Sequence, residues 1–195
     1  MSKYYYLIAG LPNIALDDSK MTYSVSEFRQ EIEGQLSKAD RKLIDLFFLK
    51  YENGNVVSHV KYPDRDSDSR GRITYEEFND LYKALKDEEK PPKNEHIPPY
   101  IEEFFKLYLA EEAKDVKGEK VYISWEDRLA ALYYDYAMNC GNKFVADWFE
   151  LNLNINNMLT AITCRKYGLD KSDYIIGHNE VAESIRTSNA RDFGL

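Results

Sequence analysis

The sequence predicts an all-α protein, a multi-helix bundle of antiparallel helices, and three observations support this prediction. Apolar residues recur at steps of three and four over long stretches of the 195-residue chain, which is the spacing of one face of a helix. Ser, Thr or Asn residues stand just ahead of several of these stretches, where helices take their N-caps. Glycine or proline follows several of them, where helices commonly end.

The longest helix is predicted from Asn142 to Tyr167, about 39 Å at ~1.5 Å rise per residue. Residues 139–142 separate it from a preceding helix that starts at Ser124, and Gly168 stops it in the position where glycine commonly turns left-handed. One face of the long helix is apolar at alternating steps of four and three. We expect this face to be part of the core, and it consists of Phe144, Trp148, Leu151, Ile155, Met158 and Ile162.

The first 90 residues are predicted to form an N-terminal helical part. Residues 4–11 are a short apolar run, and its periodicity leaves strand and helix open. Helices are expected over residues 24–33, from Ser37 onwards and over residues 74–87, the last two starting with capping-box sequences. The Asn-Gly-Asn sequence at 53–55 is expected to break the second of these helices.

Residues 91–99 contain two Pro-Pro pairs among charged residues, which indicates a Pro-rich linker with extended backbone. This linker separates residues 1–90 from a C-terminal helical part, residues 100–195, and we expect both parts to form one compact unit. The C-terminal part is expected to contain a helix that starts at Pro99, the two helices described above, and a short last helix capped by Asn179. The polar tail from Thr187 is expected to be loose.

The net charge of −8 bears on the kind of partner that the chain can have. It argues against bare nucleic-acid binding and against adhesion to anionic lipid, both of which favour a basic surface. No stretch approaches the ~18 consecutive apolar residues of a membrane span, and the first residues do not resemble a signal peptide. We therefore expect a cytoplasmic protein with protein partners.

Residues 66–77 resemble the calcium loop of an EF-hand. Asp66, Asp68 and Glu77 stand at the first, third and twelfth positions, and Gly71 stands at the sixth. Arg70 occupies the fifth position, where a ligand oxygen is expected and where a guanidinium opposes cation binding. We expect a solvated loop leading into a capped helix, and the alternative is a calcium-binding module with Asp66, Asp68 and Glu77 as ligands.

The sequence indicates neither a catalytic centre nor a bound cofactor. His59, His96 and His178 lie far apart and lack the spacing of metal ligands. Serine elbows, phosphate-binding glycine loops and dinucleotide fingerprints do not occur. Cys140 and Cys164 are expected to be free thiols in a reducing compartment. We therefore expect a protein that is not an enzyme.

Two regions of the C-terminal part are predicted to contact a partner. Three tyrosines lie within four positions of one helix, so they cannot all face its core side, and tyrosine is favoured at interfaces. Four asparagines crowd six positions of the long helix, although asparagine is a mediocre helix former, which indicates polar contacts. The predicted partner-binding residues are Tyr133, Tyr134, Tyr136, Asn152, Asn154, Asn156 and Asn157.

Three segments resemble an uncharacterised bacterial family encoded among the subunits of V-type (A/V-type) ATP synthases. They are residues 4–12 (YYYLIAGLP), residues 43–49 (LIDLFFL) and the final third of the chain. The final third is also similar to the C subunit of these rotary machines, called d in eukaryotes. The similar residues there are Asn157-Met158, the run Arg165-Lys166-Tyr167-Gly168-Leu169-Asp170, and Gly177.

This resemblance implies an all-helical, non-catalytic subunit or accessory, C/d-like, that connects the membrane rotor ring to the central shaft. Its partners would be other V-type ATPase subunits, and it would lie peripheral to the inner membrane through its complex without inserting itself. The chain departs from the C subunit in two ways. It is long enough for only one or two of the three helical lobes, and Thr163 stands where the C subunit usually has an arginine. The alternatives are the calcium-binding module and a generic helical protein-interaction adaptor.

Overall fold

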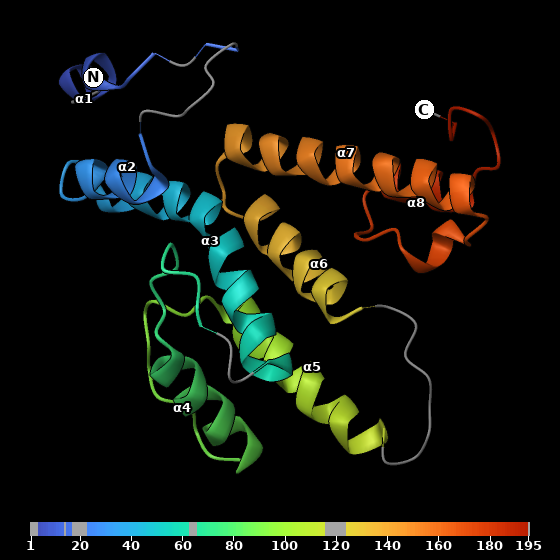
Figure 1. Cartoon of the computed structure of the whole chain (residues 1–195), viewed down its shortest axis with the longest axis horizontal. Helices are drawn as coiled ribbons and strands as arrows, with labels where there is room; N and C mark the ends of the chain where they lie inside the picture. Colours follow the sequence, from blue (N-terminus) through green and yellow to red (C-terminus); the bar gives the residue numbers. More distant parts are fainter. Residues whose placement is uncertain (1–3, 14, 17–22, 63–65, 116–123, 195) are drawn as a thin grey trace. The chain divides into compact units, whose positions relative to one another are not determined.

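The computed structural model describes residues 4–13, 15–16, 23–62, 66–115 and 124–194, with the backbone alone for residues 112–115. Within these ranges all regular secondary structure is helical, so the predicted all-α class is confirmed (Figure 1). The helices are α1 (Tyr5–Gly10), α2 (Val25–Ile32), α3 (Lys38–Lys61), α4 (Tyr75–Lys86), α5 (Pro99–Asp115), α6 (Trp125–Met138), α7 (Lys143–Tyr167), the 3-10 turn η1 (Lys171–Asp173) and α8 (Glu180–Thr187).

The chain divides into two compact units, Met1–Lys50 and Tyr51–Leu195. The division falls inside α3, whereas the sequence prediction placed a boundary at residues 91–99. That Pro-rich segment lies within the second unit, where the Asn94 side-chain amide donates to Glu77 Oε1 on α4 at 2.7 Å. The linker is therefore tied to the helix that precedes it.

In the first unit, hydrogen bonds attach α1 to the start of α3. The Tyr4 hydroxyl donates to Asp40 Oδ2 at 2.6 Å and accepts the backbone N–H of Ser37 at 2.9 Å. Ser37 in turn accepts the Asp40 N–H, as its capping-box sequence predicts. The question left open for residues 4–11 is decided in favour of a helix, α1.

The predicted break at residues 53–55 is wrong, because α3 continues without interruption to Lys61. The side chains that were expected to compete with the helix backbone are bound elsewhere in the second unit. Asn53 Oδ1 accepts the Tyr100 hydroxyl at 2.6 Å, and the buried Asn55 exchanges two hydrogen bonds with the backbone of Asp68. These contacts offset the ~1 kcal/mol that glycine costs inside a helix.

Aromatic rings form the core between α4, α5 and α6. Phe78, Phe104 and Phe105 are fully buried, and Trp125 meets Phe104 edge-to-face with 5.7 Å between ring centroids. Edge-to-face pairs of this kind add to the stabilisation from area burial. α6 is also joined to the end of α3 by an ion pair between Lys61 and Glu126 at 2.8 Å.

His59 on α3 is surrounded by four aromatic rings of the second unit. The ring of Tyr75 lies at 4.6 Å and those of Phe78, Tyr82 and Phe105 at about 6 Å between centroids. The buried Nδ1 atom has no hydrogen-bond partner. Burial lowers the pKa of the imidazole below its ordinary value, because the cationic form would lose its hydration.

The free energy of unfolding is expected to fall as the pH drops from about 7.5 to about 5. Over this interval the unfolded chain takes up a proton on His59 that the folded chain resists, so acid favours unfolding. Replacing His59→Phe should flatten this part of the profile, measured by chemical denaturation at a series of pH values. The exposed His96→Phe variant is the control and should keep the wild-type slope; an unchanged slope in His59→Phe would contradict this account.

The prediction that the C-terminal tail from Thr187 is loose is wrong. Phe193 is buried in a small core with Ala161, Ile175, Ala182 and Ile185. The guanidinium of Arg165 stacks over the Phe193 ring at 4.3 Å. The tail is also held by hydrogen bonds from Arg165 to the carbonyls of Ala190 and Arg191, so it is attached by contacts that composition alone does not reveal.

Candidate interaction surface on α7

The α7 helix has well-defined ends, and both agree with the sequence prediction. Asn142 caps the first turn, where its Oδ1 accepts the Val145 N–H at 3.1 Å. Gly168 adopts φ +67°, and the N–H of Leu169 bonds back to the Cys164 carbonyl at 2.9 Å. This closing pattern satisfies terminal carbonyl groups of the helix.

One face of α7 packs against α6, and its C-terminal half packs against η1 and α8 (Figure 1). The aromatic contact between α6 and α7 is edge-to-face, with 5.5 Å between the ring centroids of Tyr133 and Phe149. Cys164 is buried here, and burial raises the pKa of its thiol, as in a structural cysteine. The buried residues recur at steps of four and then three, and they are Val145, Phe149, Leu153, Asn157, Ala161 and Cys164.

The apolar face that was predicted to be core is exposed instead. Ile155 lies about 160° around the helix from the buried Leu153. The prediction failed because α7 has two apolar faces, and periodicity identifies faces without showing which one a neighbour covers. We call the exposed face the α7 strip; its members are between 37% and 74% exposed, and they are Phe144, Trp148, Leu151, Ile155, Met158, Leu159 and Ile162.

The strip has the period of a coiled-coil seam. Six of its residues follow steps of four, three, four, three and four, so equivalent positions recur every seven residues, or 3.5 residues per turn. Trp148, Ile155 and Ile162 occupy positions of type a, and the residues between them occupy positions of type d. The strip is therefore the kind of surface into which a second helix can insert its side chains.

Polar residues border the strip and change character along it. The first turns carry Lys143, Asp147 and Glu150, and Lys143 forms an ion pair with Asp147 at 2.8 Å. The last turn carries Arg165 and Lys166, both exposed. Between these charged ends the polar residues of α7 are uncharged asparagines and threonines.

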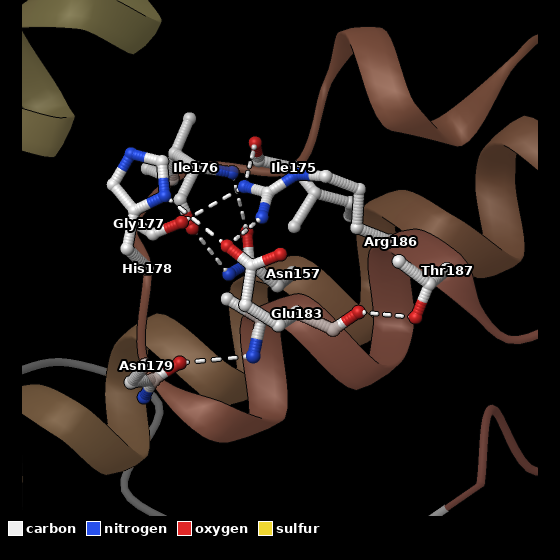
Figure 2. A network of polar contacts seen from close by, with 10 residues as sticks. Asn157, Ile175, Ile176, Gly177, His178, Asn179, Glu183, Arg186 and Thr187 are labelled. Atoms are coloured by element: carbon white, nitrogen blue, oxygen red, sulfur yellow. Dashed lines mark hydrogen bonds and ion pairs between the residues drawn. The ribbon is translucent and has the colours of Figure 1, made fainter.

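A buried amide fixes the loop between η1 and α8 to α7. Asn157 is 1% exposed, and its Nδ2 donates to the Ile176 carbonyl at 2.8 Å while its Oδ1 accepts the Ile176 N–H at 3.1 Å (Figure 2). Gly177 follows with φ +77°, where a Cβ atom would lie 2.9 Å from Leu153 Cδ2. The loop therefore approaches α7 so closely that a Cβ atom at position 177 would force the Leu153 side chain to shift.

Arg186 on α8 holds the same loop from the other side. Its Nη2 donates to the carbonyls of Ile175 at 3.1 Å and Gly177 at 2.8 Å, and its Nη1 donates to Glu183 at 2.5 Å (Figure 2). Arg186 and the nearby His178 lower the pKa of the Glu183 carboxyl. Together with the Asn157 contacts, this network makes a firm support behind the strip.

The seven residues predicted to bind a partner lie in different surroundings. Tyr133 is buried against Phe149, and burial raises the pKa of its hydroxyl. Tyr134 is half-buried and accepts a hydrogen bond from Asn156 Nδ2 at 2.7 Å. Tyr136 is 36% exposed, with its ring centroid 5.3 Å from that of Tyr100.

Of the four asparagines, Asn157 serves the internal contact just described. Asn154 Oδ1 accepts the side chain of Asn179, the N-cap of α8, at 2.8 Å. Asn152 donates to the Trp148 carbonyl of its own helix at 2.7 Å. Asn152, Asn154 and Asn156 border the strip. The strip itself is absent from the predicted partner-binding residues, because its apolar spacing predicts a buried face.

Two of the three candidate calcium ligands in the EF-hand-like loop, Asp68 and Glu77, have separate partners. Arg70 binds Asp68 through Nε at 2.9 Å and Nη2 at 2.6 Å and lowers the pKa of that carboxyl to about 2. Glu77 caps α4 by accepting the Thr74 N–H at 2.8 Å, and Asp66 is exposed. The loop is fixed by the buried Glu52, which accepts the Arg72 N–H at 2.5 Å and lies 20 positions earlier in the chain, where no local pattern indicates this role.

Calcium is expected neither to release heat nor to raise the melting temperature when it is titrated into the protein. Converging oxygen ligands are required for Ca²⁺, and here the carboxylates of Asp68 and Glu77 already serve other partners. Isothermal titration calorimetry and thermal denaturation test this, with Asp68→Asn as the control that should respond like the wild type. A calcium-dependent shift that Asp68→Asn abolishes would contradict the prediction.

Among the residues that the structure describes, no group of three or more His, Cys, Asp or Glu side chains is placed to hold a metal ion. In the same described part of the chain, no helix is both long and apolar enough to cross a membrane.

Comparison with known proteins returns one family. The family described as "Protein of unknown function (DUF2764)" matches residues 1–195, so the α7 strip and its support lie inside the match. No curated protein and no solved structure matches the chain.

Proposed function

Because the chain belongs to the DUF2764 family of proteins of unknown function, we propose its function from the surface itself: it is a non-catalytic subunit that binds a helix along the α7 strip. The observation that carries this proposal is the exposure of seven large apolar side chains along one face of a single helix. Contiguous apolar patches of this kind mark protein interaction sites on proteins that are otherwise well packed.

The rigidity of α7 supports a mechanical role. The helix has 25 residues, is capped at both ends, and is supported on its other face by α6, α8 and the Asn157 contacts. A surface held in this way loses little conformational entropy when a partner binds, which favours affinity.

The resemblance of the chain to V-type ATP synthase proteins supports a more specific proposal. In this proposal the chain is a subunit or accessory of a V-type ATP synthase, a C/d-like connector between the membrane rotor ring and the central shaft. It works at the cytoplasmic side and reaches the membrane through the other subunits. A stiff helical surface without reactive groups suits a part that transmits torque between other molecules.

Co-purification tests this proposal directly. The tagged full-length chain is expressed with the V-type ATP synthase subunits, and the ring and shaft subunits are expected in the eluate. Ile155→Glu, which places a charge in the middle of the strip, should reduce their recovery at least tenfold, a loss of ~1.4 kcal/mol or more in binding.

Leu107→Glu is the matched control, because Leu107 is exposed to a similar degree on α5, outside the strip. Its recovery of ring and shaft subunits should equal that of the wild type. If the wild-type chain associates with neither subunit, the V-type ATP synthase assignment fails. If Ile155→Glu binds as well as the wild type, the strip is not the surface involved.

A further inference from the structure

The spacing of the α7 strip indicates which period and which length the apolar seam of a partner helix must have. A seam of alternating a and d positions buries its side chains only against a helix with a seam of the same 3.5-residue period. Six such positions cover residues 144–162, so the partner must supply about five turns. α7 meets this requirement itself, because two copies of α7 present identical seams.

The charges on α7 select the direction in which two copies would pair. The first turns carry one lysine and two acidic residues, a net charge of −1, while the last turn carries Arg165 and Lys166, a net charge of +2. A parallel pair would place the two basic ends side by side. An antiparallel pair places the two basic ends at opposite ends of the contact, so they do not repel each other.

An antiparallel register exists in which every seam residue finds an apolar counterpart. Phe144 then faces Ile162 of the second copy, Trp148 faces Met158, and Leu151 faces Ile155. Each of these three layers occurs twice, because the two-fold axis passes at the level of residue 153. Isologous pairing of this kind closes the assembly at two copies.

The borders of the strip suit the same register. Near the two-fold axis, Asn152 and Asn154 lie opposite their own counterparts. A carboxylate or lysine there would repel its copy, whereas an amide both donates and accepts hydrogen bonds and so fits against itself. Two of the asparagines predicted to contact a partner thus border the contact between copies.

The exposed area is sufficient for a stable pair. From their exposed fractions, the seven strip residues present on the order of 650 Å² per copy, taking aromatic and large aliphatic side chains at roughly 150–250 Å² each. A standard interface buries about 800 Å² per partner, and the flanking residues of α7 supply the remainder.

We propose that two copies of this chain associate through an antiparallel coiled coil formed by α7 and its counterpart. This inference rests on the proposed function, since it names the helix that the strip binds. The dimer would present two copies of the remaining surfaces, related by the two-fold axis, to any larger assembly.

Sedimentation velocity of the full-length chain tests the dimer. The wild type and Leu107→Glu are expected to sediment as dimers that dissociate on dilution, while Ile155→Glu sediments as a monomer with an unchanged helical circular dichroism spectrum. A wild type that remains monomeric up to its solubility limit would overturn the proposal, as would an Ile155→Glu variant that still dimerises.

Cysteine cross-linking tests the direction of the helices without introducing a charge into the interface. In a Cys140→Ser, Cys164→Ala background, Phe144→Cys and Ile162→Cys chains carrying different tags are mixed and oxidised. The antiparallel register predicts disulfides between the two kinds of chain only. Disulfides within either kind alone indicate a parallel pair, and the absence of any disulfide contradicts the register; both results overturn the proposal.

The two proposals can fail separately. In one outcome, the chain is monomeric in isolation but co-purifies with the ring and shaft subunits. This result would support the proposed function and contradict the dimer, and the strip would then bind a helix of another subunit. In the other outcome, the chain forms a dimer that Ile155→Glu abolishes, but neither the ring nor the shaft subunits co-purify with it. This result would support the dimer and contradict the V-type ATP synthase assignment.

Discussion

Replacing Asn157→Ala is expected to lower the free energy of unfolding by about 2–3 kcal/mol, because it removes both hydrogen bonds to the backbone of Ile176. Each backbone group left without a partner in this partly buried loop adds to the cost, and the small cavity left by the amide adds more. Urea denaturation followed by circular dichroism measures the change.

Asn152→Ala is the matched control, since it makes the same substitution on the same helix. Its Nδ2 bonds only to a carbonyl of α7 itself, so the expected change is within about 0.5 kcal/mol. Equal effects of the two substitutions would contradict the assigned role of Asn157. A loss of hydrogen-exchange protection confined to residues 174–187 in Asn157→Ala would support it further.

Gly177→Ala is expected to cost about 3 kcal/mol of stability. Its φ of +77° disfavours any side chain, and the added Cβ would also lie 2.9 Å from Leu153 Cδ2 in the core behind the strip. The melting temperature and the chemical denaturation midpoint should both fall.

Gly141→Ala separates the two causes, because Gly141 has the same φ of +77° but open space where its Cβ would be placed. It should cost only about 1 kcal/mol, the backbone contribution alone. If both variants are equally destabilised, the close approach of the loop to Leu153 contributes nothing, and the support behind the strip is looser than the structure indicates.

Local signals in the chain were enough to predict most helices and their ends. Thr74, Ser124 and Asn179 all cap helices as their positions suggested. Gly168 ends α7 with a left-handed backbone for the reason that glycine is common there. These predictions succeed because a cap is a contact between residues that are three or four positions apart, so the sequence contains both partners.

Predictions that depended on distant residues were less successful. Residues 53–55 remain helical because Tyr100 and the backbone of Asp68, far along the chain, occupy the side chains of Asn53 and Asn55. The tail is held by Phe193 for a similar reason. Neither partner can be identified from the spacing of neighbouring residues.

The α7 strip shows the same difference between what the local sequence predicts and what tertiary packing decides. The amino-acid order alone was sufficient to specify that α7 is a long helix with an apolar face at steps of four and three. Which face meets the rest of the protein depended on packing, where the face bearing Leu153 and Ala161 meets α6 and α8 and leaves the strip exposed. Hydrophobicity is a property of each side chain, whereas burial is a property of the neighbours that the fold brings to it.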